Sequence, residues 1–201
     1  MIINKKTLAE AERVLRKCRH LGPVMKQHGI CELDPESQAP FETLISSIIA
    51  QQLSVKAANT IESRVRNLVG VPYKPKQLLS TSHEDLRKCG LSNRKAEYIT
   101  GLAQAASDNS LDFEALSLLT DYEVIKELTR FRGVGQWTAE MLMIFSLGRM
   151  DIFSSRDVGL QRGMKSLFGE KANSLSDMEE LASRWQPYRS VASWYLWKIV
   201  D

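Results

Sequence analysis

Cysteine and histidine are scarce in this sequence, and their scarcity excludes several classes of metal protein. A disulfide framework or a zinc site needs closely spaced partners, and an iron–sulfur cluster needs four clustered ligands. The three cysteines have no CxxC spacing, and the three histidines have no metal-ligand spacing: Cys18, Cys31 and Cys89, and His20, His28 and His83. We therefore expect reduced structural thiols, histidines at or near the surface, and no metal held by side chains.

Long hydrophobic runs are also absent. The longest apolar stretch, MLMIFSLG at 141–148, is far shorter than the roughly 20 residues that span a bilayer. Residues 1–20 contain neither the apolar core nor the cleavage site of a secretory signal. We expect an intracellular protein without a membrane partner, located in the cytoplasm or nucleoid, or in the nucleus of a eukaryote.

Neither sign of charge dominates the chain. The 201 residues carry a formal net charge of +3, and the isoelectric point is about 8.7. Such a mildly basic chain permits a nucleic-acid partner without requiring one. Basic residues gather in 13–20 and 86–95, but each run alone is better interpreted as a solvated helix face.

The alternation of apolar and polar residues that is typical of β-strands is missing. Apolar residues recur with a helical period instead. Five apolar residues of the segment 41–52 fall on one helical face: Phe41, Leu44, Ile45, Ile48 and Ile49. Capping serines and terminal glycines mark several helix ends, and the prolines lie at boundaries. The pattern predicts an all-α chain with short loops and helices at 41–52, 54–70, 82–90, 92–108, 120–131, 135–148, 157–168, 175–185 and 188–200.

One tight turn lies in residues 128–139, LTRFRGVGQWTA, where two glycines bracket a valine between two predicted helices. Glycine adopts positive φ at little cost and places no Cβ in the way. Successive backbone N–H groups can then point outward, together with the free N–H groups and the positive dipole end of the second helix. This arrangement fits a phosphate oxygen and predicts a sequence-independent hold on a nucleic-acid backbone. Val134 is expected to point inward, between the helices.

The turn and its surroundings resemble the helix-hairpin-helix DNA glycosylase superfamily. In that family the hairpin continues into a loop that ends in a required aspartate, and here residues 148–163 supply such a loop with Asp157. Residues 40–61, 90–103 and 185–197 resemble further recurrent segments, so the resemblance covers most of the chain. It is strongest to the alkylpurine branch, which includes the bacterial inducible 3-methyladenine glycosylases and their small relatives.

The resemblance implies an all-α fold of two helical lobes with a cleft between them. The whole chain, 1–201, would form one glycosylase unit. Lobe A is expected to combine residues 1–39 with 155–201, and lobe B to comprise residues 40–154. The implied activity is base flipping from duplex DNA followed by hydrolysis of the N-glycosidic bond in base excision repair.

Trp137 occupies the position at which relatives that also cut the DNA backbone carry a Schiff-base lysine. An aromatic side chain offers no amine there, so we predict a glycosylase without lyase activity. Alkylation at N3 or N7 makes a purine cationic and a good leaving group, so no strong acid is needed. A carboxylate can stabilise the oxocarbenium-like sugar and orient water, and Asp157 is our candidate, facing Trp137 across the cleft. Asp157 is also a preferred helix N-cap, and the two roles are compatible.

A flipped, electron-poor base needs an aromatic pocket. The resemblance assigns Trp137 and Trp197 to its wall, with Met141 one helical turn beyond Trp137, where some relatives carry an aromatic residue. Arg189 and Ser190 are expected to serve structure. The other aromatic residues near the end of the chain are expected in the core: Trp185, Tyr188 and Trp194.

The DNA contacts are expected at the hairpin and at a wedge that fills the gap left by the flipped base. In the turn 50–54, AQQLS, Gln52 stands at the place of the inserted side chain and Leu53 follows it; which of the two enters the stack is open. Gln51 either belongs to this wedge or caps the helix end. The family implies that carbonyls of the hairpin can hold an alkali-metal ion, and no other cofactor is required. The hairpin residues expected at the DNA backbone are Arg132, Gly133, Val134, Gly135 and Thr138.

Two further residues depart from the family pattern. Ser155 stands where relatives usually have proline, and Arg156 stands where many have a second acidic residue. Arg156 can pair with a phosphate or with Asp157. These departures keep open a second hypothesis, a lesion-sensing DNA-binding protein of the same fold with weak or no catalysis. Asp157 and Trp137 favour the enzyme, a monomer that removes 3-methyladenine, and next 7-methylguanine, from double-stranded DNA.

Overall fold

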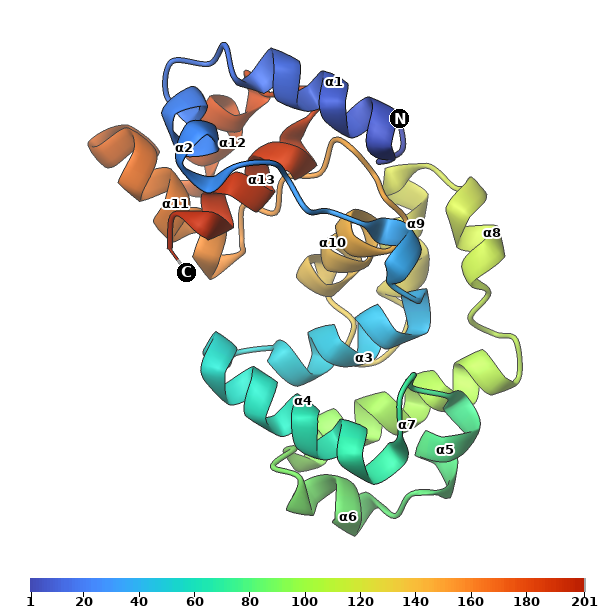
Figure 1. Ribbon diagram of the computed structural model, residues 1–201. Helices are drawn as coiled ribbons and strands as arrows, with labels where there is room; N and C mark the ends of the chain where they lie inside the picture. The colour runs from blue at the N-terminus through green and yellow to red at the C-terminus, as the bar shows by residue number, and fades with distance from the viewer. Residues whose placement is uncertain (201) are drawn as a thin grey trace. The chain divides into compact units, whose positions relative to one another are not determined.

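The structure is a computed structural model in which residues 1–200 are described (Figure 1). Over these residues the chain forms thirteen α-helices and two short 3-10 helices, with an isolated β-bridge between Ile2 and Arg149 and no strand. The all-α prediction is therefore confirmed. None of the described helices is long and apolar enough to cross a membrane.

The chain divides into two compact units. Unit 1 combines Met1–Ser37 with the chain from Met143 onward, and unit 2 is Gln38–Leu142. The chain first passes from unit 1 to unit 2 after Ser37, close to the lobe boundary expected after residue 39. The chain returns to unit 1 between Leu142 and Met143, inside a helix. This boundary is earlier in the sequence than the one expected after Ser154. The loop that precedes Asp157 groups with unit 1 because the start of the last helix bonds to it, as described below.

Unit 2 is built around a buried helix that was predicted from its apolar face. Figure 1 shows α3 beside α4 and α7, and α7 packs further against α5 and α6. The five apolar residues expected on one face of α3 are all buried. The helices of unit 2 are α3 (Pro40–Ala50), α4 (Val55–Val69), α5 (Pro75–Ser80), α6 (His83–Lys88), α7 (Asn93–Ser107), α8 (Phe113–Leu118), α9 (Asp121–Leu128) and most of α10 (Gln136–Phe145).

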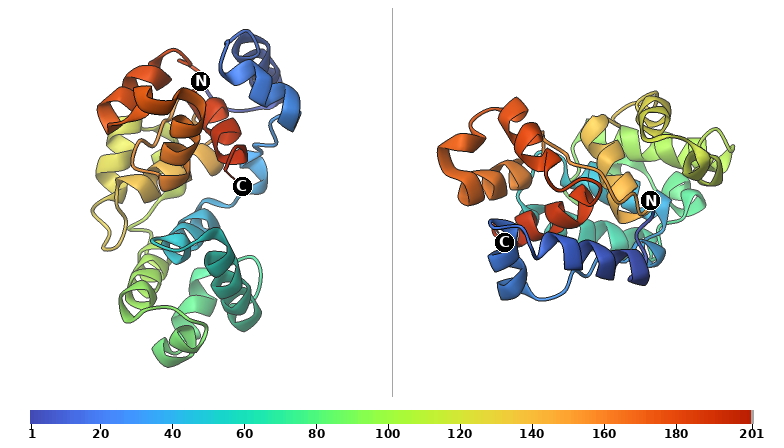
Figure 2. Two further views of the ribbon diagram at one scale, coloured as in Figure 1. Left: turned by 90° about the vertical axis from the view of Figure 1, so that its left-hand side faces the viewer. Right: turned by 90° about the horizontal axis from the view of Figure 1, so that it is seen from above.

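Unit 1 is organised around its last helix. Its elements are α1 (Lys5–Leu15), α2 (Leu21–His28), η1 (Pro35–Ser37), α11 (Val158–Phe168), η2 (Gly169–Ala172), α12 (Leu175–Ser183) and α13 (Arg189–Lys198). Helix α13 packs against α1, α2 and α11, as Figure 2 also shows. Trp185, Tyr188 and Trp194 are buried in this unit, which confirms their assignment to the core.

A half-buried carboxylate ties the first and last helices of unit 1 together. One oxygen of Glu12, on α1, accepts hydrogen bonds from the Tyr195 hydroxyl and from the Cys31 backbone N–H, both at 2.6 Å. Burial raises the pKa of the Cys31 thiol to about 12, so this cysteine stays protonated. Cys31 therefore behaves as the structural thiol expected from the sequence.

Helix ends follow the capping signals of the sequence. Ser54, Ser82, Ser92 and Asp157 each accept a hydrogen bond from a backbone N–H of the first turn that follows. The predicted ranges omit four helices: α1, α2, α5 and α8. Of these, α5 and α8 have six residues each, too few to show a helical period. Proline in the first turn of α5 and the N-cap Asp112 of α8 were the local signals for them.

Candidate functional site

Asp157 lies at the N-terminus of α11, where two different groups bind one of its carboxylate oxygens. Oδ1 accepts a hydrogen bond from the Leu160 backbone N–H at 2.7 Å and another from the indole N–H of Trp197 at 2.8 Å. The first bond is the predicted N-cap. The second comes from α13, so two helices fix the orientation of this carboxylate.

Trp197 was expected only in the wall of the base pocket, but it also contacts Asp157 and a second aromatic ring. It is half-buried, and its ring stacks on Phe145 with centroids 5.5 Å apart and an angle of 27° between the planes. The N–H on one edge of the indole donates to Asp157, while one face of the ring stacks on Phe145. The structure brings Trp197 and Asp157 together, and Phe145 is a supporting residue that the sequence analysis missed.

Two glycines of α11 allow α13 to come this close. A Cβ on Gly159 would lie 2.8 Å from Cδ1 of Trp197, and a Cβ on Gly163 would lie 2.6 Å from the carbonyl oxygen of Leu196. Glycine inside a helix costs about 1 kcal/mol relative to alanine. Here the missing side chains leave room for the neighbouring helix. The signal was visible as GLQRG, since residues four apart share one helical face.

The loop before Asp157 is held by hydrogen bonds in place of the family's proline. Ser155 is buried, and its hydroxyl donates to Oε1 of Glu179 at 2.7 Å. Its carbonyl oxygen accepts from the side chain of Gln161 at 3.0 Å. Arg156, the other departure from the pattern, is exposed.

The first turn of α13 holds the same loop farther upstream. Arg189 donates from Nε and Nη2 to the two carboxylate oxygens of Asp151, at 2.7 and 3.0 Å. The Ser190 hydroxyl donates to the Arg149 carbonyl oxygen and accepts from the Ile152 N–H. These contacts confirm the structural role expected for Arg189 and Ser190.

In unit 2 the Gly-Val-Gly turn connects α9 to α10. Gly133 has φ +88°, a conformation that L side chains rarely adopt, and a Cβ there would overlap the Tyr98 side chain. Val134 is only 5% exposed, which confirms that it points inward. Gly135 is exposed, and a Cβ there would meet nothing within 4 Å. The first glycine is thus required by packing, and the second leaves the outer side of the turn open.

The remaining hairpin residues differ in what they can offer to DNA. Arg132 is exposed and lies near the Tyr98 ring and the Glu97 carboxylate. Thr138 is 1% exposed, so its side chain cannot reach a phosphate. A phosphate contact by this residue would have to come from its backbone N–H. In any α-helix the backbone N–H groups of the first turn lack a carbonyl partner in the helix itself. A phosphate contact at this turn therefore relies on backbone groups and Arg132.

Trp137 is the second residue of α10 and is half-buried, while Met141 follows one turn later and is buried. Both belong to unit 2, whereas Asp157 and Trp197 belong to unit 1. The assignment of Trp137 and Met141 to the base pocket, and the approach of Trp137 to Asp157, stay predictions.

The predicted wedge is a tight turn at the end of α3. Gln51 has φ −47° and ψ 128°, Gln52 has φ 57°, and the Leu53 N–H donates to the Ala50 carbonyl oxygen at 3.1 Å. This is a type II β-turn. Gln52 and Leu53 are exposed, as an inserted side chain must be. Gln51 is the C-cap residue of α3, as one of the two expectations had it. Its side chain donates to the hairpin, to the Gly133 carbonyl oxygen and the Thr138 hydroxyl.

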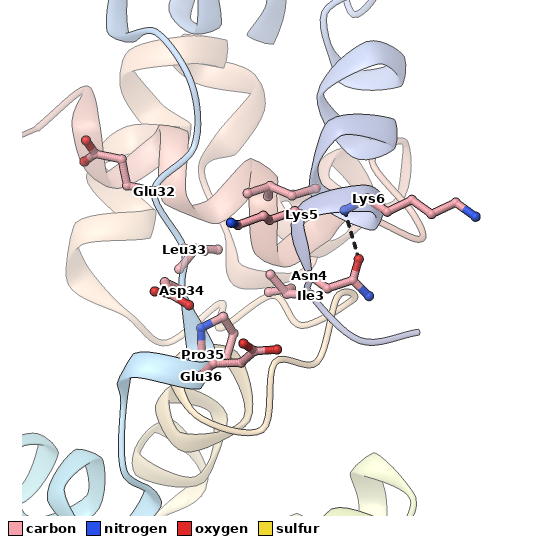
Figure 3. A pocket seen from close by; sticks show the side chains of 10 residues that line it. Ile3, Asn4, Lys5, Lys6, Glu32, Leu33, Asp34, Pro35 and Glu36 are labelled. Atoms are coloured by element: carbon pink, nitrogen blue, oxygen red, sulfur yellow. Dashed lines mark hydrogen bonds between the residues drawn. The ribbon is translucent and has the colours of Figure 1, made fainter.

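A surface hollow of about 500 Å³ lies in unit 1 between the start of α1 and residues 32–36 (Figure 3). Its lining mixes the cations Lys5 and Lys6 with acidic residues and includes none of the predicted site residues. The acidic residues are Glu32, Asp34 and Glu36.

Comparison with known families decides the identity of the chain. Residues 45–187 match the family described as "HhH-GPD superfamily base excision DNA repair protein". The matched segment includes the second half of α3, the hairpin and the loop to Asp157, and it covers more than half of the chain.

The chain belongs to the HhH-GPD superfamily.

Individual relatives narrow the class. The protein is 34% identical over 182 residues to the alkylbase DNA glycosidase-like protein mag2 of Schizosaccharomyces pombe, covering 88% of this chain and 85% of the relative. A crystal structure of DNA-3-methyladenine glycosidase from Bacillus halodurans has 42% identity and a TM-score of 0.76, covering 94% and 89% of the two chains. The 3-methyladenine DNA glycosylase Mag1 of Schizosaccharomyces pombe in complex with abasic DNA has 30% identity and a TM-score of 0.86, covering 94% and 95%. This HhH-GPD protein is therefore a DNA glycosylase of base excision repair, and DNA is its partner.

The two hairpin glycines give a prediction about the stability of this glycosylase. Gly133→Ala should lower the free energy of unfolding by more than about 1 kcal/mol, because it adds a Cβ at positive φ and against Tyr98. Gly135→Ala is the matched control. It should leave the free energy of unfolding within about 0.5 kcal/mol of the wild-type value, since its Cβ meets nothing within 4 Å. Urea denaturation followed by circular dichroism measures both, and equal losses would contradict this description of the turn.

Proposed function

We propose that the protein is a monofunctional DNA glycosylase that acts on double-stranded DNA as a monomer. Its proposed first substrate is 3-methyladenine, and its proposed second substrate is 7-methylguanine. The observation that carries the proposal is the carboxylate of Asp157, held by a helix N-terminus and by the indole N–H of Trp197. The names of the Bacillus halodurans and Schizosaccharomyces pombe structures, both of 3-methyladenine enzymes, support this substrate class. The proposed place of action is inside the cell, where genomic DNA lies.

The proposed chemistry needs only a few groups of this chain. A purine alkylated at N3 or N7 is cationic, so the bond between C1′ and N9 breaks with its electron pair going to the base. The sugar is left with oxocarbenium character, which the Asp157 carboxylate stabilises electrostatically. Water then forms a bond to C1′ and loses a proton, and Asp157 can orient that water and accept the proton. The N–H donors on Oδ1 hold the carboxylate in one orientation throughout.

The hairpin and the wedge turn supply the hold on DNA in this proposal. Arg132 and the N–H groups of Gly133, Gly135 and Thr138 contact phosphates, which position the protein without reading sequence. The Val134 N–H, expected among these donors from the sequence, instead donates to the Phe131 carbonyl oxygen. The exposed Gln52 or Leu53 fills the gap that base flipping leaves. Trp137, Met141 and one face of Trp197 line the base pocket.

An alkali-metal ion would have to use main-chain carbonyls of the hairpin. Uncharged oxygen atoms of this kind suit such an ion, although two of them already accept hydrogen bonds. The Phe131 carbonyl accepts from the Val134 N–H, and the Gly133 carbonyl accepts from Gln51. When bound, the ion would add positive charge near a DNA phosphate.

Asp157→Asn tests the catalytic carboxylate. Asparagine caps helices about as well as aspartate, so α11 should stay intact. Release of free 3-methyladenine from methylated DNA should fall on the order of a hundredfold or more, because the negative charge beside the sugar is lost. Asp112→Asn is the matched control, since Asp112 caps α8 in the same way, and its release should equal that of the wild type.

Equal release by wild type and Asp157→Asn would mean that another carboxylate acts. If the wild type binds lesion DNA and releases no base, the protein is the lesion sensor of our second hypothesis.

Trp197→Phe tests the second anchor of the carboxylate. Phenylalanine keeps a ring against Phe145 and removes the N–H donor to Asp157. A hydrogen bond to a charged group contributes about 1.5–3 kcal/mol, so the single-turnover excision rate should fall at least roughly tenfold. Trp194→Phe, a core substitution on the same helix, should leave the rate of the folded enzyme unchanged. A normal rate for Trp197→Phe would show that Leu160 and the loop suffice to orient Asp157.

Borohydride trapping tests the absence of lyase activity. A lysine nucleophile would form a Schiff base with the abasic sugar, and reduction would link protein and DNA covalently. With Trp137 at that position, we expect no cross-linked band on a denaturing gel. A band that disappears when one lysine is replaced would overturn the monofunctional assignment.

A further inference from the structure

The wedge turn contains a residue in a strained backbone conformation. Position three of a type II turn requires positive φ and is usually glycine or asparagine, yet here it is Gln52 with φ 57°. The left-handed conformation costs a residue with a Cβ about 1–2 kcal/mol. Such a conformation persists only when the surrounding contacts impose it.

Lys95 of α7 supplies the first of these contacts. Its ammonium group donates to the carbonyl oxygens of Ile49, at 2.7 Å, and Gln51, at 2.6 Å. Both carbonyls lie at the end of α3, where the helix leaves its last C=O groups without partners. A cation is also favourable at this negative end of the helix dipole. Lys95 thus closes the end of α3 from the side of α7.

Gln51 supplies the second set of contacts, in the opposite direction. Its side-chain amide donates one hydrogen to the Gly133 carbonyl oxygen and one to the Thr138 hydroxyl, both at 2.9 Å. An amide has two donor hydrogens, so these two acceptors use both of them. Gly133 is fixed against Tyr98, and Thr138 is buried in α10. The Gln51 side chain therefore fastens the wedge turn to the hairpin.

We propose that Gln51 and Lys95 are positioning residues that hold the wedge turn in a fixed place relative to the hairpin. The hairpin, which holds phosphate, and the wedge turn, which inserts Gln52 or Leu53, then form one rigid element. This inference rests on the proposed roles of the hairpin and the wedge. Without these contacts the hairpin still holds the DNA backbone, but the turn relaxes and inserts less often.

The test separates backbone binding from insertion. Gln51→Met removes the amide at similar length without adding charge, and Lys95→Met releases the other side of the turn. Gln104→Met, at an exposed position of α7, is the control. Fluorescence anisotropy measures affinity for an undamaged duplex. Insertion is measured with a duplex that contains a tetrahydrofuran abasic site opposite 2-aminopurine, whose fluorescence reports local unstacking.

Both positioning variants should bind undamaged DNA within about twofold of wild type. Affinity for the abasic duplex and its fluorescence response should fall about tenfold, the effect of losing one to two net hydrogen bonds. Lys95→Arg, which keeps donors, should restore much of the response, and Gln104→Met should match wild type. In a Gln52→Ala/Leu53→Ala background the Gln51→Met effect should vanish, because the wedge it positions is gone.

Equal losses for undamaged and abasic duplexes, or a Gln51→Met effect that persists without the wedge, would overturn the proposal. If Gln51→Met does not fold, Lys95→Met and Lys95→Arg decide the question alone. The abasic duplex requires no base release, so this experiment gives an answer even if the wild type fails to excise 3-methyladenine.

Discussion

A chain made of short helices must satisfy the backbone groups that every helix end leaves without a partner, and this constraint shapes the whole protein. The first N–H groups and last C=O groups of each helix need side chains, water or other backbone to bond with. Asn4, Ser54, Thr120 and Ser174 meet this need locally, each at the start of its own helix. Where the partner comes from another helix, the bond also fixes two helices together.

The groups to which we assign a function lie at such helix ends. Asp157 caps α11 and is held by α13, so the proposed catalytic carboxylate also supports the fold. Gly133 and Gly135 turn the chain just before the start of α10, where the proposed hold on DNA lies. Lys95 donates to the last carbonyl groups at the end of α3, and the turn that follows, the proposed wedge, is exposed. The three proposed roles, catalysis, backbone binding and insertion, are thus all placed at helix ends.

The parts of this arrangement that depend on neighbours in sequence could be predicted. The buried face of α3, the caps at Ser54 and Asp157 and the inward Val134 follow from residue types a few positions apart. The bond from Gln51 to Gly133 spans 82 positions, and that from Trp197 to Asp157 spans 40. Such pairs depend on how helices pack. A tryptophan can offer either a ring face or an N–H, and only packing shows that Trp197 uses both.

The contact between α11 and α13 also bears on the order in which the protein is assembled during synthesis. Gly159 and Gly163 weaken the intrinsic helicity of α11, and their value appears only when α13 lies against them. Chains emerge with the N-terminal part first, at about 5–20 residues per second. Asp157 is therefore translated seconds before the indole that orients it. A nascent chain can complete all of unit 2, with its hairpin and wedge, while the carboxylate still lacks its second anchor.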